Sequence, residues 1–154
     1  MDDQGTQAVL VRRAREDAGL SQRQLAALSG VRQPNLAAIE SGARKPGHDV
    51  LDRILRAARL RPSIALELKA ADIRRIADHA GLHNVRVFGS AVRGTDTEHS
   101  DVDLLVDAGT DVDFLALAAF REEVSRLIGF PVDAVVDDGD DAAVRAIRSE
   151  AVPL

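Results

Sequence analysis

The chain has 154 residues, a length that fits one domain of ordinary size or two small ones. It contains no cysteine, which excludes disulfides, thiol catalysis and thiolate metal sites. No apolar stretch reaches the roughly 20 residues needed to span a bilayer, and the polar start MDDQGTQ lacks the basic and apolar regions of a signal peptide. We therefore expect a soluble cytoplasmic protein with no membrane partner.

The net charge of -5 is divided unevenly along the chain. Residues 1–69 hold 12 Lys and Arg against 8 Asp and Glu, or +4, whereas residues 70–154 hold 8 against 17, or -9. This asymmetry favours two modules with different partners, a polyanion for the basic half and divalent cations for the acidic half. Two ordinary solvated surfaces are the alternative.

Residues 6 to 60 show the pattern of four or five short helices and no strand. Ser21 followed by Gln24 is a capping-box pattern, which predicts a helix start. Gly30 is suited to a left-handed turn at the end of that helix, and Pro34 is tolerated in the first turn of the next. After a first helix that ends by Gly19, the predicted helices cover about residues 22–28, 32–41 and 49–58.

A short helix, a glycine turn and a second short helix are typical of a helix-turn-helix. The second helix would pack through Leu36 and Ile39 and leave Arg32, Gln33 and Asn35 facing outward. Gln and Asn can bind adenine with two hydrogen bonds, and Arg can bind guanine in the same way. The candidates for phosphate contacts are Gln22, Arg23, Arg44 and Lys45.

The segment GLSQRQLAALSGVRQPNLAAIESGARKP resembles the lambda-repressor-like (XRE) DNA-binding domain, over about residues 6–62. The resemblance implies an all-α helix-turn-helix domain that acts as a homodimer on a two-fold operator. The alternative is a helical bundle used only for dimerisation.

Arg61-Pro62-Ser63 marks the expected linker, so we predict domains at residues 1–62 and 63–154. Strands alternate with helices in the second domain, which indicates an α+β (α/β) fold. The predicted helices cover residues 63–81, 113–128 and 140–149, and the predicted strands cover residues 84–88, 102–107 and 131–136.

Gly89-Ser90 follows an apolar run, and Asp101-Val102-Asp103 opens a second apolar run after a gap of ten residues. Residues i and i+2 of a strand point to the same face, so Asp101 and Asp103 would project side by side. Neighbouring carboxylates repel unless cations lie between them. The pattern therefore favours a two-metal site for phosphoryl or nucleotidyl transfer.

Other residues are candidates for the same site. Gly89 allows a close backbone approach to phosphate, and Ser90 adds a hydroxyl and an N–H. Asp133, an acid in an apolar strand, is a candidate third carboxylate; a strand-edge residue facing water is the alternative. Arg93 is either a phosphate contact or a solvated loop residue. The second Asp-x-Asp, at residues 111–113, is interpreted as a helix N-cap region, and His83 and His99 as surface residues.

The pattern of Gly-Ser, ten residues and Asp-x-Asp resembles the minimal nucleotidyltransferase family of the polymerase-beta-like superfamily, over about residues 70–154. The resemblance implies a small mixed sheet and two Mg²⁺ ions held by Asp101 and Asp103, with Asp133 as third carboxylate or proton acceptor. It further implies ATP or another NTP as substrate, with Gly89, Ser90 and Arg93 on its phosphates.

Many members of this family are antitoxins paired with a HEPN-type ribonuclease toxin, and some transfer AMP to that toxin. About 85 residues leave no room for a substrate-binding domain, so we expect a partner protein as acceptor. The expected protein is an antitoxin that represses its own operon and modifies its toxin. The alternatives are a regulator whose second domain only binds nucleotide or partner, and a small-molecule nucleotidyltransferase.

Overall fold

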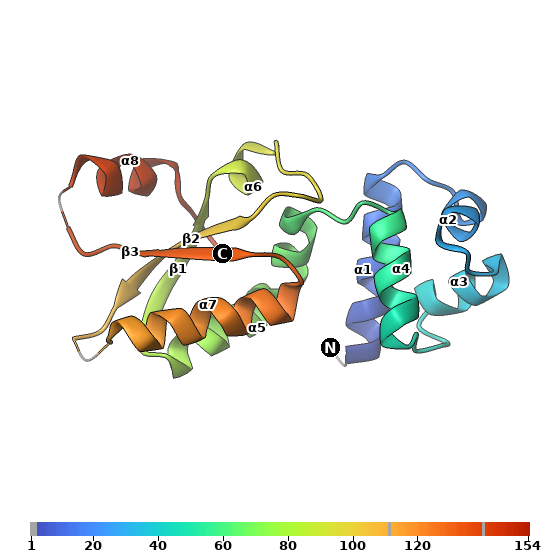
Figure 1. The fold of residues 1–154 in the computed structure, drawn as a ribbon, viewed down its shortest axis with the longest axis horizontal. Coiled ribbons are helices and arrows are strands. Elements are labelled where there is room, and N and C mark those ends of the chain that lie inside the picture. Colours follow the sequence, from blue (N-terminus) through green and yellow to red (C-terminus); the bar gives the residue numbers. More distant parts are fainter. Residues whose placement is uncertain (1–2, 111, 140) are drawn as a thin grey trace.

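The computed structural model describes residues 3–110, 112–139 and 141–154. The chain folds into an N-terminal helical region followed by an α/β region, and Figure 1 shows the two at opposite ends of an elongated molecule. No helix of the described residues is long and apolar enough to cross a membrane.

The helical region consists of four helices, α1 (Asp3–Asp17), α2 (Gln22–Ser29), α3 (Gln33–Glu40) and α4 (His48–Ala57). The predicted capping box is present, since the Ser21 hydroxyl accepts from the Gln24 N–H and the Gln24 side chain accepts from the Ser21 N–H. Gly30 ends α2 in the left-handed conformation, at φ 67°. The four predicted helices are confirmed, with ends shifted by one or two residues.

The α/β region is built from α5 (Pro62–His79), β1 (Leu82–Phe88), α6 (Ser90–Arg93), β2 (Val102–Ala108), α7 (Phe114–Ile128), β3 (Val132–Val136), α8 (Ala142–Glu150) and β4 (Val152–Pro153). The sequence did not predict α6 or β4. Asp113 caps α7 by accepting from the Ala116 N–H, as expected for the second Asp-x-Asp; Asp111 lies outside the described residues.

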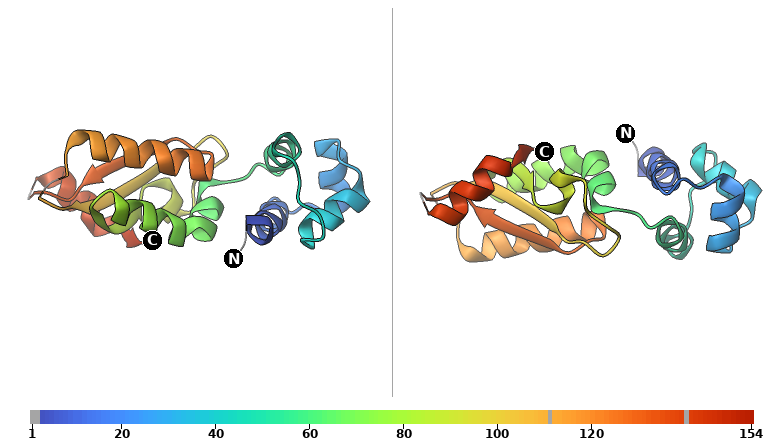
Figure 2. Two further views of the ribbon diagram at one scale, coloured as in Figure 1. Left: turned by 90° about the horizontal axis from the view of Figure 1, so that it is seen from below. Right: turned by 90° about the horizontal axis from the view of Figure 1, so that it is seen from above.

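The four strands form one mixed sheet in the order β3-β2-β1-β4. β1 is antiparallel to β2 and β4, whereas β2 and β3 are parallel and joined by α7. Helices α5 and α7 lie side by side against one face of the sheet (Figures 1 and 2). This confirms the predicted α+β class with a small mixed sheet.

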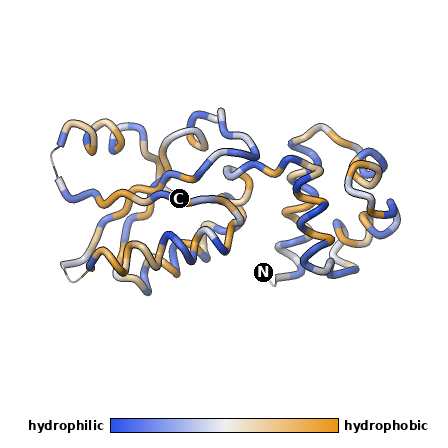
Figure 3. Tube along the Cα trace, in the orientation of Figure 1, coloured by the Kyte–Doolittle hydropathy of each residue, from blue (hydrophilic) through white to orange (hydrophobic). Residues whose placement is uncertain are grey.

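The core is mostly aliphatic, and its largest fully buried side chain is Phe120. Fully buried side chains include Ile54 in the helical region and Leu104 and Leu105 in β2. Figure 3 shows apolar residues recurring along the helices and through the central strands. Burial at roughly 25 cal/mol per Å² of apolar surface is the main stabilising contribution to such a core.

Candidate functional site

The predicted carboxylates lie where β2 and β3 begin and where β1 ends. Asp103, the second residue of β2, lies opposite Phe88 of β1 on one side and Asp133 of β3 on the other. Asp101 directly precedes β2 and is exposed. Because β2 and β3 are parallel and in register, Asp103 and Asp133 are neighbours across the sheet, as the sequence reading anticipated.

Gly89 is required at this edge for two reasons. Its backbone adopts φ 75° and ψ -148°, a region essentially restricted to glycine. A Cβ at this position would stand 2.3 Å from Oδ2 of Asp103. The predicted reason for Gly89 was the approach of a phosphate; in the structure, its missing side chain makes room for the Asp103 carboxylate.

The surroundings of Asp103 disfavour its charged form. Burial raises the pKa of Asp103, and the charges of Asp101 and Asp133 raise it further. Arg93 lowers this pKa and Glu150 raises it, so both side chains lie within electrostatic reach. Crowded carboxylates of this kind become favourable when a cation joins them.

The donor set fits a hard cation. Mg²⁺ prefers oxygen ligands and is usually held by one or two carboxylates together with substrate phosphates. Asp101 and Asp103 are the candidate carboxylates, and that of Asp103 lies against Gly89. Within the described residues, no group of three or more acidic, His or Cys side chains is gathered closely enough to hold a metal ion.

The third predicted carboxylate has a partner of its own. Asp133 forms an ion pair with Arg121 of α7, and its side chain is 59% exposed. The sheet therefore places the backbone of Asp133 beside Asp103, while its carboxylate is bound to a guanidinium. The role of Asp133 as metal ligand stays a prediction.

Arg93 and Ser90 both lie on α6, directly after Gly89. The Arg93 guanidinium is paired with the carboxylate of Glu150, the last residue of α8. Sequence reasoning missed Glu150 because α8 and α6 are far apart in the chain. Its position just before the closing Ala151-Val152-Pro153-Leu154, which pairs with β1, is the signal that could have found it.

The helical region presents the second predicted surface. Gly30 separates α2 from α3, whose first residues are Gln33, Pro34 and Asn35. Leu36 and Ile39 are buried, as predicted, so the opposite side of α3 is left for contacts outside the molecule. Arg23, Arg32, Arg44 and Lys45 are all exposed.

A hydrogen-bonded chain of polar side chains positions this surface. Buried Glu40 accepts from Arg15 Nε at 2.7 Å and from Gln22 Nε2 at 2.9 Å. The Gln22 amide oxygen in turn accepts from Gln33 Nε2 at 3.1 Å. Arg44 donates to Asn35 Oδ1 at 3.1 Å. The side chains predicted to read bases are therefore oriented by the protein itself.

The chain thus combines a helix-turn-helix with a small mixed sheet that carries paired aspartates beside a glycine turn. A family model described as a nucleotidyltransferase domain matches residues 72–152, and a helix-turn-helix model matches residues 11–63. The chain belongs to the nucleotidyltransferase domain family and carries an XRE-type helix-turn-helix in front of that domain.

Known proteins resemble the two parts separately. An uncharacterized HTH-type transcriptional regulator of Mycobacterium tuberculosis is 50% identical over 50 residues, which are 32% of this chain and 36% of the relative. The protein adenylyltransferase MntA of Thermococcus cleftensis is 36% identical over 63 residues, 41% of this chain and 64% of the relative. The chain thus spans between about a third and two thirds of these curated relatives.

A solved structure assigned as a minimal nucleotidyltransferase is 32% identical, with a TM-score of 0.54. The match covers 60% of this chain and 95% of that structure. A weaker likeness, to a toxin-antitoxin solved with AMP-PNP, covers 54% of this chain and 69% of that chain, with a TM-score of 0.48 and 20% identity. A likeness at that level supports no functional comparison.

Proposed function

We propose that this protein is an antitoxin-like nucleotidyltransferase, with domains at residues 1–62 and 63–154. The observation that carries the proposal is the pair Asp101 and Asp103 at the start of β2, with the Asp103 carboxylate in the space that Gly89 leaves. The first domain would bind operator DNA as a homodimer. The second would transfer AMP from ATP to a partner protein, a HEPN-type ribonuclease toxin.

In the proposed reaction, a hydroxyl oxygen of the partner forms a bond to the α-phosphorus of ATP. The bond from that phosphorus to the oxygen bridging to the β-phosphate breaks, and pyrophosphate leaves. The hydroxyl proton passes to a carboxylate, for which Asp133 is the candidate. Gly89, Ser90 and Arg93 would hold the leaving phosphates, so that catalysis rests on positioning and charge.

Asp101 and Asp103 are the residues that would hold Mg²⁺, with two ions expected and Asp133 as the third carboxylate. When bound, Mg²⁺ supplies the positive charge that offsets charge developing on the phosphates. The similarity to a protein adenylyltransferase supports ATP as the nucleotide.

For DNA, Arg32, Gln33 and Asn35 would reach base edges in the major groove. Contacts to phosphates would come from Gln22, Arg23, Arg44 and Lys45, which position the domain without reading sequence. The similarity to a transcriptional regulator over 50 residues supports this assignment.

Label transfer tests the enzymatic proposal. The protein is mixed with Mg²⁺, the product of the adjacent gene and ATP, GTP, CTP or UTP labelled at the α-phosphate. Label on the partner with ATP is expected, and its loss in the Asp101→Asn, Asp103→Asn double variant. Asp138→Asn, an exposed acid just beyond the other end of β3, is the matched control and should retain transfer. No label on any protein would contradict the transferase proposal.

A second candidate is a regulator whose nucleotidyltransferase domain only binds nucleotide or partner. The observation that favours it is the engagement of two site residues in ion pairs, Asp133 with Arg121 and Arg93 with Glu150. Binding of ATP without transfer to any protein, together with intact operator binding, would identify this function.

A further inference from the structure

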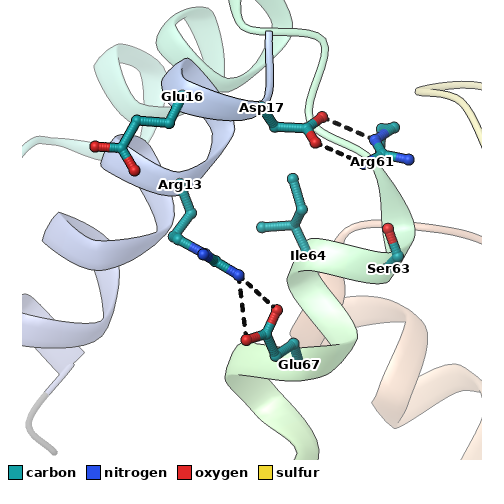
Figure 4. A pocket seen from close by; sticks show the side chains of 7 residues that line it. All are labelled: Arg13, Glu16, Asp17, Arg61, Ser63, Ile64 and Glu67. Carbon is teal, nitrogen blue, oxygen red and sulfur yellow. Dashed lines mark hydrogen bonds and ion pairs between the residues drawn. The ribbon is translucent and has the colours of Figure 1, made fainter. Parts of the chain in front are cut away.

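The link between α4 and α5 makes polar contacts in two directions. Arg61, the residue before α5, donates from Nε to the carboxylate of Asp17 at 2.8 Å, at the end of α1 (Figure 4). Its Nη1 donates to Oδ1 of Asp96 at 3.1 Å. One guanidinium therefore joins the helical region to the loop between α6 and β2.

Asp96 is a fully buried carboxylate, with a side-chain exposure of 0%. A buried carboxylate is costly unless it is paired and hydrogen-bonded. Asp96 has both kinds of partner, because Oδ2 also accepts from the Ser63 N–H at 2.8 Å, in the first turn of α5. The positive end of the α5 dipole adds to this stabilisation.

The loop that Asp96 anchors leads directly to the candidate metal site. Inside it, the Thr97 N–H donates to the Ser100 hydroxyl and the Ser100 N–H donates to the Thr97 carbonyl, both at 3.0 Å. Asp101 is the next residue. A displacement at Asp96 would therefore be passed on within five residues to a carboxylate of the site.

Arg59, in the same link, makes a second and weaker contact with this loop. Nε of Arg59 lies 3.8 Å from Oε1 of Glu98. Arg59 has φ 50°, an unusual left-handed conformation for a non-glycine residue, at the turn that leads from α4 toward α5. Arg59 and Arg61, two residues apart in the link, thus both contact the same loop.

We infer that Asp96 and Arg61 are positioning residues, which hold the loop before Asp101 in place and tie it through Asp17 to the DNA-binding region. The effect on nucleotide rests on the proposed function of the Asp101–Asp103 site; the effect on the loop does not. By this inference the nucleotide site is shaped in part by α1, a helix of the other region.

The structure supplies a matched control. Arg13 and Glu67 form another ion pair between α1 and α5, at 2.9 Å, with side chains that are 50% and 62% exposed (Figure 4). This pair joins the same two helices but does not touch the loop. Arg13→Ala removes a contact between the regions and leaves Arg61 and Asp96 intact.

Two measurements on the full chain test the inference. The first is hydrogen exchange at the amides of Thr95, Thr97, Ser100 and Val102, all hydrogen-bonded in the structure. The second is the affinity for a non-hydrolysable ATP analogue with Mg²⁺. Exchange in the loop is compared with exchange at amides elsewhere in the same variant, so that a general loss of stability is not mistaken for a local effect.

Asp96→Asn keeps an acceptor for the Ser63 N–H but removes the charge. We expect faster exchange in the loop and about tenfold weaker binding of the analogue, since small displacements at a site are costly. Arg61→Ala should do the same, with partial recovery in Arg61→Lys. Asp17→Asn should have a smaller effect of the same kind, and Arg13→Ala should have none.

Unchanged loop exchange in Asp96→Asn and Arg61→Ala would overturn the inference. If Asp17→Asn behaves like Arg13→Ala, the connection to α1 is overturned. Absence of analogue binding by the unaltered protein would count against the proposed function, and the exchange measurement would still decide whether Asp96 and Arg61 position the loop.

Discussion

The two candidate sites differ in how their polar groups are satisfied. On the proposed DNA-binding surface, Gln33 is hydrogen-bonded to Gln22, Gln22 to Glu40, and Glu40 to Arg15. At the start of β2, burial raises the pKa of Asp103, and its acidic neighbours raise it further. The polar groups of the first surface are satisfied within the protein, whereas the proposed role of the second is to bind cations. Comparable substitutions at the two sites test this difference.

The largest effect is expected from removing the charges of both aspartates at the start of β2. Asp101→Asn with Asp103→Asn should lower transfer by at least about a thousandfold, because metal-ion charge stabilisation is worth several kcal/mol. Transfer assays and gel-shift measurements on the same preparation provide the check. Operator binding should persist; if it is lost as well, the two sites are not separable.

The corresponding change in the helical region should act on stability. Glu40→Ala removes the close carboxylate partner of Arg15, which is mostly buried, and leaves only Glu16 at 3.6 Å. Breaking a buried ion pair from one side costs about 3 kcal/mol or more. Urea unfolding measures the loss. A loss well below 1 kcal/mol would mean that the Glu40 network contributes little.

Gly89→Ala tests whether the proposed transfer site depends on the backbone conformation of Gly89. The strained φ alone should cost about 1–3 kcal/mol of folding free energy, and the added Cβ would meet Asp103 Oδ2. Thermal unfolding and transfer should both be impaired. Gly94→Ala, which also has a positive φ but nothing within 4 Å of its Cβ, separates strain from the contact with Asp103.

Gln33→Ala with Asn35→Ala should weaken operator binding by about 1–3 kcal/mol for each lost bidentate contact. Fluorescence anisotropy at fixed salt gives the affinity. Nucleotide transfer should stay within experimental error of the unaltered protein. If the variant binds the operator with the same affinity as the unaltered protein, α3 does not read bases.

The smallest effects are shifts of stability with pH, of opposite sign in the two regions. A hydrogen bond from Arg61 lowers the pKa of Asp17 below 3.8, so its stabilisation is present above 3.8 and is lost as the pH falls through the lowered value. The pKa of Asp103 is raised, so stability falls as the pH rises from 3.8 through the raised value.

At neutral pH without metal, Asp17→Asn should therefore lower the melting temperature and Asp103→Asn should raise it. Both differences should vanish in acid below the lowered pKa of Asp17, where both carboxyls are protonated with or without folding. Scanning calorimetry across this range is the measurement. If the melting temperature changes in the same direction in both variants, the electrostatic difference between the regions is contradicted.

Local patterns carried most of the fold and the choice of site residues. Ser21 and Gln24 predicted the start of α2, and Asp101 and Asp103 predicted the start of β2, because each pattern lies within a few residues of the chain. The four-residue α6 and two-residue β4 are too short to show periodicity. β4 is defined only by its pairing with β1, and α6 is a single helical turn between β1 and β2.

The partners of Asp133 and Arg93 could not be predicted, for a different reason. Arg121 lies 12 residues before Asp133, and Glu150 lies 57 residues after Arg93. Such pairs depend on how α7 and α8 pack against the sheet. Composition showed that the second half is acidic, but only the fold shows which acids meet arginines.

Strand β3 lies at one edge of the sheet, so one side of its backbone is open to pairing with another chain. Of its five residues, Val132-Asp133-Ala134-Val135-Val136, only Asp133 carries a charge. Replacing this aspartate with a neutral residue would leave a short apolar edge of the kind that promotes aggregation. We therefore expect Asp133 to disfavour pairing of β3 with another copy of the protein, and variants at this position should be handled at low concentration.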